Sequence, residues 1–426
     1  MGYIHFRFFI VILHPKSFSV MNWIESIIKR SSPISALNNE EQMLISELVR
    51  YAANNKGGKY SVGTMLAAFY DLTIAAVYYT NITSAGWLYC KHDNPRLILP
   101  YINCCPIHAL EGKFEFHKSS KPTSAIIGQA TARVLLLYYQ EVFKIQKVFI
   151  RVNKAPEPAD AIFIDLPNKN VYFAEIKSSP LLTPALSMNC DEMTDYSDDG
   201  GIKPLKHQPT SNPNVLNKEL SIIIPKKVQS RWTAKYYSIG MKRSANDDLF
   251  AYKGIRNLIS DTDFMETYLD YWEKSFEAYC KKDERENIFW LTNACGKPSS
   301  LGKEWKGGVT CISDEKTSVG MDRTDDIKKG IYQVLKLGSE GKVVRTDWNY
   351  KIGILSNIHP ARHFDVYLKP IKDMIWTITE KKDVKLANDL EPNTPMYNLF
   401  DGIITFTRQY VRDNWISSTL KFLNND

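Results

Sequence analysis

The sequence has few of the features that mark several common protein classes. Its seven cysteines in 426 residues are odd in number and scattered, which argues against a disulfide framework and for a reducing cytoplasm. No uninterrupted apolar run reaches the roughly eighteen residues of a membrane-spanning helix. The Gly-rich stretch at 295–308 lacks the spacing of a phosphate-binding loop, and His359 and His363 lie in no nucleophilic triad pattern. These absences leave a cytoplasmic globular chain of about two or three domains.

The first twenty residues do not read as a targeting signal. The run "YIHFRFFIVIL" is short, is interrupted by His5 and Arg7, and lacks a small-residue cleavage site. The segment "NWIESIIKR", directly after Met21, has the pattern of an amphipathic helix. We therefore treat Met21 as a candidate start and residues 1–20 as a candidate non-native extension.

The stretch "APEPADAIFIDLPNKNVYFAEIKSS" at 155–179 contains two β-rich runs with charged residues at their outer ends. Residues 161–166 and 171–176 have the length and composition of strands, and residues 167–170 form a turn cluster. The pattern predicts a β-hairpin, and it raises the question of why a strand with a core composition should end in Glu-Ile-Lys.

The predicted register of the hairpin brings three charged side chains together. If Asn168 and Lys169 are the central turn residues, Asp160 lies opposite Lys177 and diagonal to Glu175, and all three share one face of the sheet. Diagonal neighbours in a sheet are roughly 7–8 Å apart, close enough for two carboxylates to hold one cation. The hairpin therefore has a candidate metal site at its open end.

Metal-assisted phosphodiester hydrolysis needs this set of groups. Carboxylates hold a hard cation, which polarises the phosphate and lowers the pKa of an attacking water. Lys177 would orient that water or offset developing charge, whereas Asp165 has the other parity and points away. Two close carboxylates repel in the absence of metal, so a bound Mg²⁺ would relieve the repulsion. The alternative is a hairpin whose charged ends simply reach solvent.

The order Pro158, Asp160, Glu175, Lys177 resembles the P-D…(D/E)-x-K signature of the nuclease superfamily that includes most type II restriction endonucleases. One Ala separates the Pro from the Asp, which is a minor departure because the Pro carries no chemistry. The resemblance implies that Asp160, Glu175 and Lys177 are catalytic, that Asp160 and Glu175 hold Mg²⁺, and that double-stranded DNA is the substrate. It also implies a homodimer, which would match a palindromic site.

The segments around the hairpin agree with the core of that superfamily, in which one helix precedes the hairpin and another follows the lysine strand. Residues 124–143 have apolar residues at helical spacing, and residues 322–338 begin with acids and end at a glycine. Residues 350–358 supply a further core strand. The predicted fold class is α/β, with a restriction-endonuclease-like core in which a mixed central sheet is flanked by helices.

Basic residues are concentrated between the two blocks of the predicted core. Residues 201–260 carry eleven Lys or Arg against three acids, which is +8, whereas the whole chain is only +7. Such a concentration indicates nucleic-acid contact. The alternative is an exposed basic surface that pairs with the acidic run at 191–199. The residues we expect to bind DNA are Lys226, Lys227, Arg231, Lys242 and Arg243.

A second cluster of possible ligands lies near the N-terminal region. Cys105 and His108 have the spacing of a zinc knuckle, and Cys90 and Cys104 could complete a tetrahedral structural Zn²⁺ site. No second clean Cys-x-x-Cys is present, and buried cysteines are common as inert core residues. Both interpretations stay open.

The long gap between the two core blocks predicts an inserted domain, because no catalytic core needs a loop of that length. The aromatic helix at 262–282 is expected to form that domain's own core. The expected organisation is an N-terminal mainly helical region (21–120), a first core part (121–180), an inserted DNA-recognition region (181–315), a second core part (316–360) and a C-terminal region (361–426).

The sequence therefore predicts a type II restriction endonuclease, which hydrolyses double-stranded DNA at specific sequences with Mg²⁺. One alternative is a repair or recombination nuclease with the same core that recognises DNA structure. The other is a DNA-binding module with a vestigial nuclease core, although intact Asp160, Glu175 and Lys177 count against it.

Overall fold

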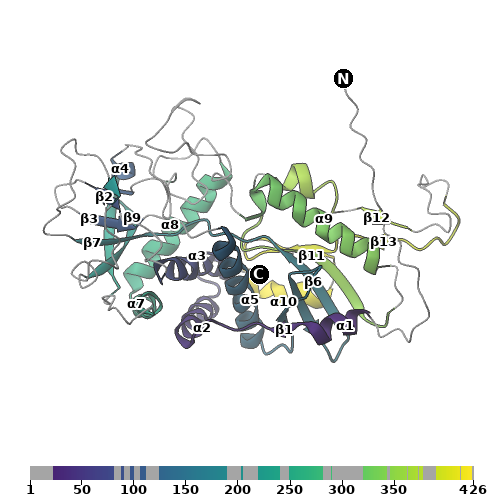
Figure 1. The fold of residues 1–426 in the computed structure, drawn as a ribbon. Helices are drawn as coiled ribbons and strands as arrows, with labels where there is room; N and C mark the ends of the chain where they lie inside the picture. Colours follow the sequence, from purple (N-terminus) through teal and green to yellow (C-terminus); the bar gives the residue numbers. More distant parts are fainter. Residues whose placement is uncertain are drawn as a thin grey trace, which may run out of the picture.

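The described part of the computed structural model contains two large β-sheets with helices packed around them, and a third sheet of only two strands (Figure 1). The residues that the structure describes are 23–80, 88–90, 96–99, 106–111, 124–189, 203–204, 219–239, 249–281, 289, 320–342, 346–361, 363–372, 374–377, 390–412 and 414–424.

The first sheet has seven strands in the order β1-β4-β5-β6-β11-β14-β15. Strands β6, β11 and β14 run parallel to one another, and the other neighbours are antiparallel, so the sheet is mixed. Its strands are β1 (Ser32–Pro33), β4 (Arg151–Lys154), β5 (Ala161–Asp165), β6 (Asn170–Ile176), β11 (Asn349–Leu355), β14 (Gly402–Ile404) and β15 (Tyr410–Val411). The predicted α/β class and mixed, helix-flanked sheet are confirmed.

Alternation of side chains along β5 and β6 gives this sheet two apolar faces. Phe163, Tyr172 and Ala174 belong to the core that includes helix α5 (Ser124–Ile145). The opposite face packs against α1 (Trp23–Arg30) and α9 (Thr324–Gly341) through Ile162, Ile164, Val171 and Phe173. The predicted helices before and after the hairpin are thus both present, on opposite faces of the sheet.

The second sheet has six antiparallel strands in the order β10-β9-β7-β3-β2-β8. Its strands are β2 (Leu88–Cys90), β3 (Arg96–Leu99), β7 (Ala185–Asn189), β8 (Lys203–Pro204), β9 (Leu220–Val228) and β10 (Arg231–Ser238). The sheet combines strands from the N-terminal region with strands from the predicted insertion. Strand β7 starts nine residues after β6 ends, so the chain passes from one sheet to the other directly after the lysine of the hairpin.

Four helices lie between and beside the sheets, namely α2 (Asn39–Asn54), α3 (Val62–Thr80), α7 (Phe250–Leu258) and α8 (Thr262–Cys280) (Figure 1). Helix α3 is long and apolar enough to cross a bilayer, but 94% of its most apolar window is buried inside the protein. It is therefore packed as a core helix. Most aromatic residues of α8 are buried in a core that also contains residues of α2, α3 and α5, so they do not form the separate core of the insertion that the sequence had suggested.

The remaining elements are short. They are α4 (Pro106–Leu110), η5 (Gly320–Asp322), η6 (Phe364–Leu368), α10 (Asn414–Leu420) and η8 (Lys421–Leu423), with the strand pair β12 (Ile375–Trp376) and β13 (Tyr397–Asn398).

Candidate active site

The hairpin of β5 and β6 has a different register from the predicted one. Ala161 pairs with Ala174, and Asp165 pairs with Asn170. Asp160 therefore lies beside Glu175 and Ile176 and not opposite Lys177, so the predicted register was wrong by two residues. Because side chains alternate with a period of two, a two-residue shift leaves every side chain on its predicted face.

The side chain of Asp165 explains the shift. Its carboxylate accepts hydrogen bonds from the Asn168 backbone N (3.4 Å) and Nδ2 (2.9 Å) and from Asn170 Nδ2 (3.0 Å). These bonds close the turn over residues 166–169, one residue earlier than predicted, and Lys169 takes a positive φ of 50° there. Asp165 thus has a structural role on the side of the hairpin away from the candidate site.

Asp160, Glu175 and Lys177 lie together at the open end of the hairpin. Asp160 Oδ2 accepts a hydrogen bond from the Ile176 backbone N at 2.8 Å, which fixes this carboxylate against β6. Lys177 Nζ donates to Glu175 Oε1 at 2.6 Å. Asp160 is exposed, whereas the Glu175 side chain is only 8% exposed and that of Lys177 18%. The site therefore opens to solvent on the Asp160 side.

Glu175 is held in an unfavourable environment for a carboxylate. Burial and the nearby charge of Asp160 raise its pKa to about 7, although the Lys177 ammonium opposes this shift. Burial is the largest cause because a desolvated carboxylate loses its hydration, and a second negative charge adds to the cost of ionisation. The metal-free site is thus one where a cation would be strongly favoured.

Helix α9 packs against the side chain of Lys177. A Cβ at Gly330 would lie 3.5 Å from Lys177 Cγ, which is an ordinary van der Waals distance, so the lysine stem runs directly alongside this helix. Gln333, which is one turn further along α9, has a buried Oε1 atom with no hydrogen-bond partner among the described residues. The sequence analysis did not identify Gln333.

The donor set fits a hard divalent cation. Mg²⁺ is commonly held by one or two carboxylates and completes its coordination with water and phosphate oxygens. Asp160 and Glu175 supply two carboxylates on one face, and the described residues contain no group of three or more His, Cys, Asp or Glu placed to hold a metal ion. Such a site would bind Mg²⁺ more tightly when substrate is present, because the phosphate supplies further oxygen ligands.

The basic residues predicted to bind DNA lie partly in the second sheet. Lys226, Lys227 and Arg231 are on the hairpin of β9 and β10, whose exposed tip spans residues 227–231. Lys226 Nζ lies 2.8 Å from Asp263 Oδ1 on α8, and Lys235 pairs with the same carboxylate. These ion pairs, with the hydroxyl of Tyr237, hold the pKa of Asp263 well below its usual value.

Part of the basic segment is therefore paired with α8, an arrangement that the sequence did not suggest. The acidic run at 191–199 and the residues Lys242 and Arg243 lie outside the described residues, so the alternative pairing stays open. The structure does not test the candidate zinc site either. Cys104 and Cys105 are outside the described residues, and only the backbone of Cys90 and His108 is described.

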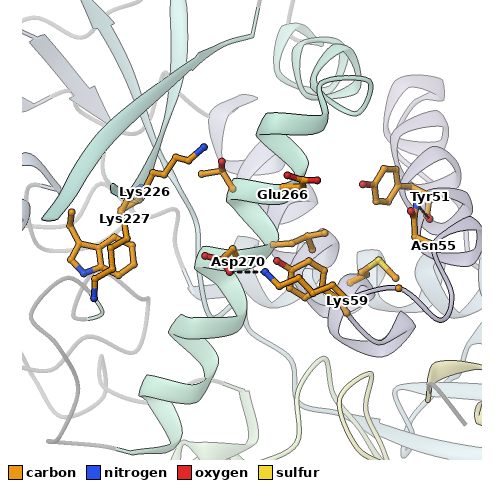
Figure 2. A pocket seen from close by; sticks show the side chains of 14 residues that line it. Tyr51, Asn55, Lys59, Lys226, Lys227, Glu266 and Asp270 are labelled. Carbon is orange, nitrogen blue, oxygen red and sulfur yellow. Dashed lines mark hydrogen bonds and ion pairs between the residues drawn. The ribbon is translucent and has the colours of Figure 1, made fainter. Parts of the chain in front are cut away.

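A groove of about 540 Å³ lies beside the basic hairpin, across helix α8 (Figure 2). Glu266 and Asp270 form its middle, with Lys226 and Lys227 on one side and the end of α2 on the other. Lys59 pairs with Asp270 at 3.0 Å. Its lining carries charges of both signs, so the groove has no clear preference for an anion such as DNA.

The sequence matches no protein-family model and no curated protein, and the structure matches no solved structure. The function must therefore be inferred from the chemistry of the site.

Proposed function

We propose that the protein is a Mg²⁺-dependent endonuclease of the restriction type, which hydrolyses phosphodiester bonds in double-stranded DNA at specific sequences. The observation that supports this proposal most is the placement of Asp160, Glu175 and Lys177. Asp160 is bonded to β6 next to Glu175, and Lys177 Nζ lies 2.6 Å from Glu175 Oε1. On this proposal the seven-stranded sheet is a restriction-endonuclease-like core.

The site also lies where a parallel sheet binds ligands. β6 and β11 run parallel and end together, since Leu355 is level with Ile176 and the Lys177 N donates to the Leu355 carbonyl at 2.9 Å. Ligands commonly bind beyond the carboxyl ends of such strands. A duplex laid across this edge would reach the two carboxylates and the lysine from the solvent side of Asp160.

Each residue has a distinct role in the proposed reaction. Asp160 and Glu175 would hold Mg²⁺, which supplies Lewis-acid polarisation of the phosphate and a water of lowered pKa. Lys177 would donate hydrogen bonds to the attacking water or to a phosphate oxygen, which offsets negative charge that develops in the transition state. For Lys177 to do so, its ammonium must break its hydrogen bond to Glu175 and form one to the water or the substrate instead.

Base recognition is assigned to the second sheet and its basic hairpin. Phosphate contacts give affinity, whereas contacts to base edges give specificity. Lys227 and Arg231 lie at the exposed tip of the β9–β10 hairpin, where Lys227 pairs with Trp232 and Val228 with Arg231. A two-stranded ribbon of this kind fits the major groove. Two copies of the chain in a homodimer would read a palindromic site.

Digestion of a plasmid and a long linear DNA with Mg²⁺ tests the proposal. A sequence-specific enzyme should give discrete, reproducible fragments that disappear with EDTA. A smear would indicate an unspecific nuclease, and cleavage restricted to junctions or flaps would indicate a repair enzyme. No Mg²⁺-dependent cleavage of any of these DNAs would overturn the assignment and favour a DNA-binding module with a vestigial core.

A further inference from the structure

Two backbone segments lie directly against Lys177. The first is residues 178–182, which follow it in the chain and lead toward the second sheet. The second is η5, which comes just before α9. A Cβ on Gly320 of η5 would lie only 3.3 Å from the Lys177 carbonyl oxygen. The position of the lysine backbone therefore depends on how both segments are held.

A buried aspartate on α3 holds the first segment. Asp71 is fully buried, and its Oδ2 accepts hydrogen bonds from the backbone N atoms of Leu181 (3.0 Å) and Leu182 (2.9 Å). The same oxygen accepts a third bond from Trp272 Nε1 of α8 at 2.7 Å. Burial raises the pKa of Asp71, so these donors offset an environment that disfavours the carboxylate.

A second buried aspartate holds the other segment. Asp322, at the end of η5, accepts hydrogen bonds from the backbone N atoms of Ala361 (2.8 Å) and His363 (3.0 Å). Its Oδ2 also accepts from the Tyr279 hydroxyl at 2.8 Å. Tyr279 is again a residue of α8 and is fully buried. One helix therefore donates to both aspartates.

The opposite end of α8 is bonded to the basic hairpin. Asp263, in its first turn, pairs with Lys226 and Lys235. Trp272 and Tyr279 are seven residues apart and so lie on one face of the helix, two turns from each other. The helix thus runs from the hairpin proposed to meet DNA to both segments that flank Lys177.

We propose that Trp272 and Tyr279 are positioning residues: through Asp71 and Asp322 they fix the two segments that flank Lys177, and they connect the basic hairpin to the catalytic lysine. Their effect on catalysis rests on the proposed nuclease function, whereas their effect on the two segments does not. A buried carboxylate that loses a donor must find another partner, and the backbone bonded to it moves in response. Displacement of a catalytic group by about 1 Å can cost on the order of 100-fold in rate.

Tyr279→Phe tests the proposal, with Tyr268→Phe as the matched control. Both tyrosines are fully buried on α8, and Tyr268 donates its hydroxyl to the Ala68 carbonyl at 2.7 Å instead of to Asp71 or Asp322. Each substitution removes one buried hydroxyl, so stability should fall by a similar amount. We expect kcat for DNA cleavage to fall about tenfold or more in Tyr279→Phe, with KM and DNA affinity unchanged, and to stay within about twofold in Tyr268→Phe.

Hydrogen exchange provides a second measurement that needs no cleavage. In Tyr279→Phe the Ala361 and His363 amides should exchange about tenfold faster than in the control variant, and in Trp272→Phe the Leu181 and Leu182 amides should do so. Equal kcat and equal exchange in Tyr279→Phe and Tyr268→Phe would overturn the proposal. If the wild type cleaves no DNA but exchange changes as expected, the nuclease function fails while the connection through α8 stands.

Discussion

At the scale of single residues, the proposed chemistry depends on a carboxyl group that the fold makes hard to ionise. Glu175 is buried, is repelled by Asp160 and is only partly compensated by Lys177, which together raise its pKa to about 7. The fold keeps this unfavourable group next to an exposed carboxylate, where a cation can reach both. This is the pattern expected of a functional site rather than of a stabilising ion pair.

This pKa predicts how stability depends on pH. Because the folded pKa of Glu175 is raised above its ordinary value of 4.5, the folded protein binds the proton more tightly than the unfolded chain. Stability without metal should therefore fall as pH rises from about 4.5 to about 7 and stay low above that. At pH 8 in EDTA, Glu175→Gln should gain about 2–3 kcal/mol over wild type in free energy of unfolding, and little at pH 4.5.

Urea unfolding at the two pH values measures this difference. Added Mg²⁺ should raise the stability of wild type at pH 8 and leave Glu175→Gln nearly unchanged, because ligand binding stabilises only a protein that has the site. The same pH dependence in both proteins would mean that Glu175 ionises normally and that the two carboxylates do not form a strained pair.

At the scale of elements, the β5–β6 hairpin shows what could be predicted from sequence and what could not. Its strands, its turn cluster and the common face of Asp160, Glu175 and Lys177 follow from composition and from the period of two. The register does not, because it is set by the Asp165 side chain, which bonds to Asn168 and closes the turn one residue early. Side-chain bonds of this kind are not encoded in an alternating pattern.

The β9–β10 hairpin supports a second prediction, on salt dependence. Lys227 and Arg231 are at the exposed tip, where Lys227 Nζ lies 5.5 Å from the centroid of the Trp232 ring, and Lys226 is paired with Asp263. Changing Lys227 and Arg231 together to Gln should weaken binding to all DNA sequences and flatten the log-log salt slope by about 0.9 for each lost phosphate contact, and so by up to about 1.8.

Lys226→Gln is the matched control for that measurement. Loss of its exposed pair with Asp263 should cost about 0–1 kcal/mol of stability and leave the slope unchanged. DNA affinity at several salt concentrations separates the variants. An unchanged slope in the double variant would remove the hairpin tip from the DNA interface.

At the scale of the whole molecule, each of the two large sheets combines strands that are distant in sequence. The β7 and β9 strands of the predicted insertion form a sheet with β3 of the N-terminal region, and β14 of the C-terminal region adds a parallel strand to the seven-stranded sheet. The sequence predicted an insertion, because the gap between the two predicted core blocks is too long for a loop. It could not predict these pairings, which depend on long-range contacts, nor the link from Trp272 to Asp71.

The central claim is that Asp160, Glu175 and Lys177 form a metal-dependent nuclease site, and cleavage by paired amide variants tests it most directly. Asp160→Asn and Asp165→Asn make the same chemical change five residues apart, on opposite faces of one hairpin. With Mg²⁺, Asp160→Asn, Glu175→Ala and Lys177→Ala should each abolish cleavage while DNA binding stays largely intact, since affinity comes mainly from other phosphate contacts. Asp165→Asn should cleave nearly as well as wild type. Full activity in Glu175→Ala, or loss only in Asp165→Asn, would contradict the assignment of the site.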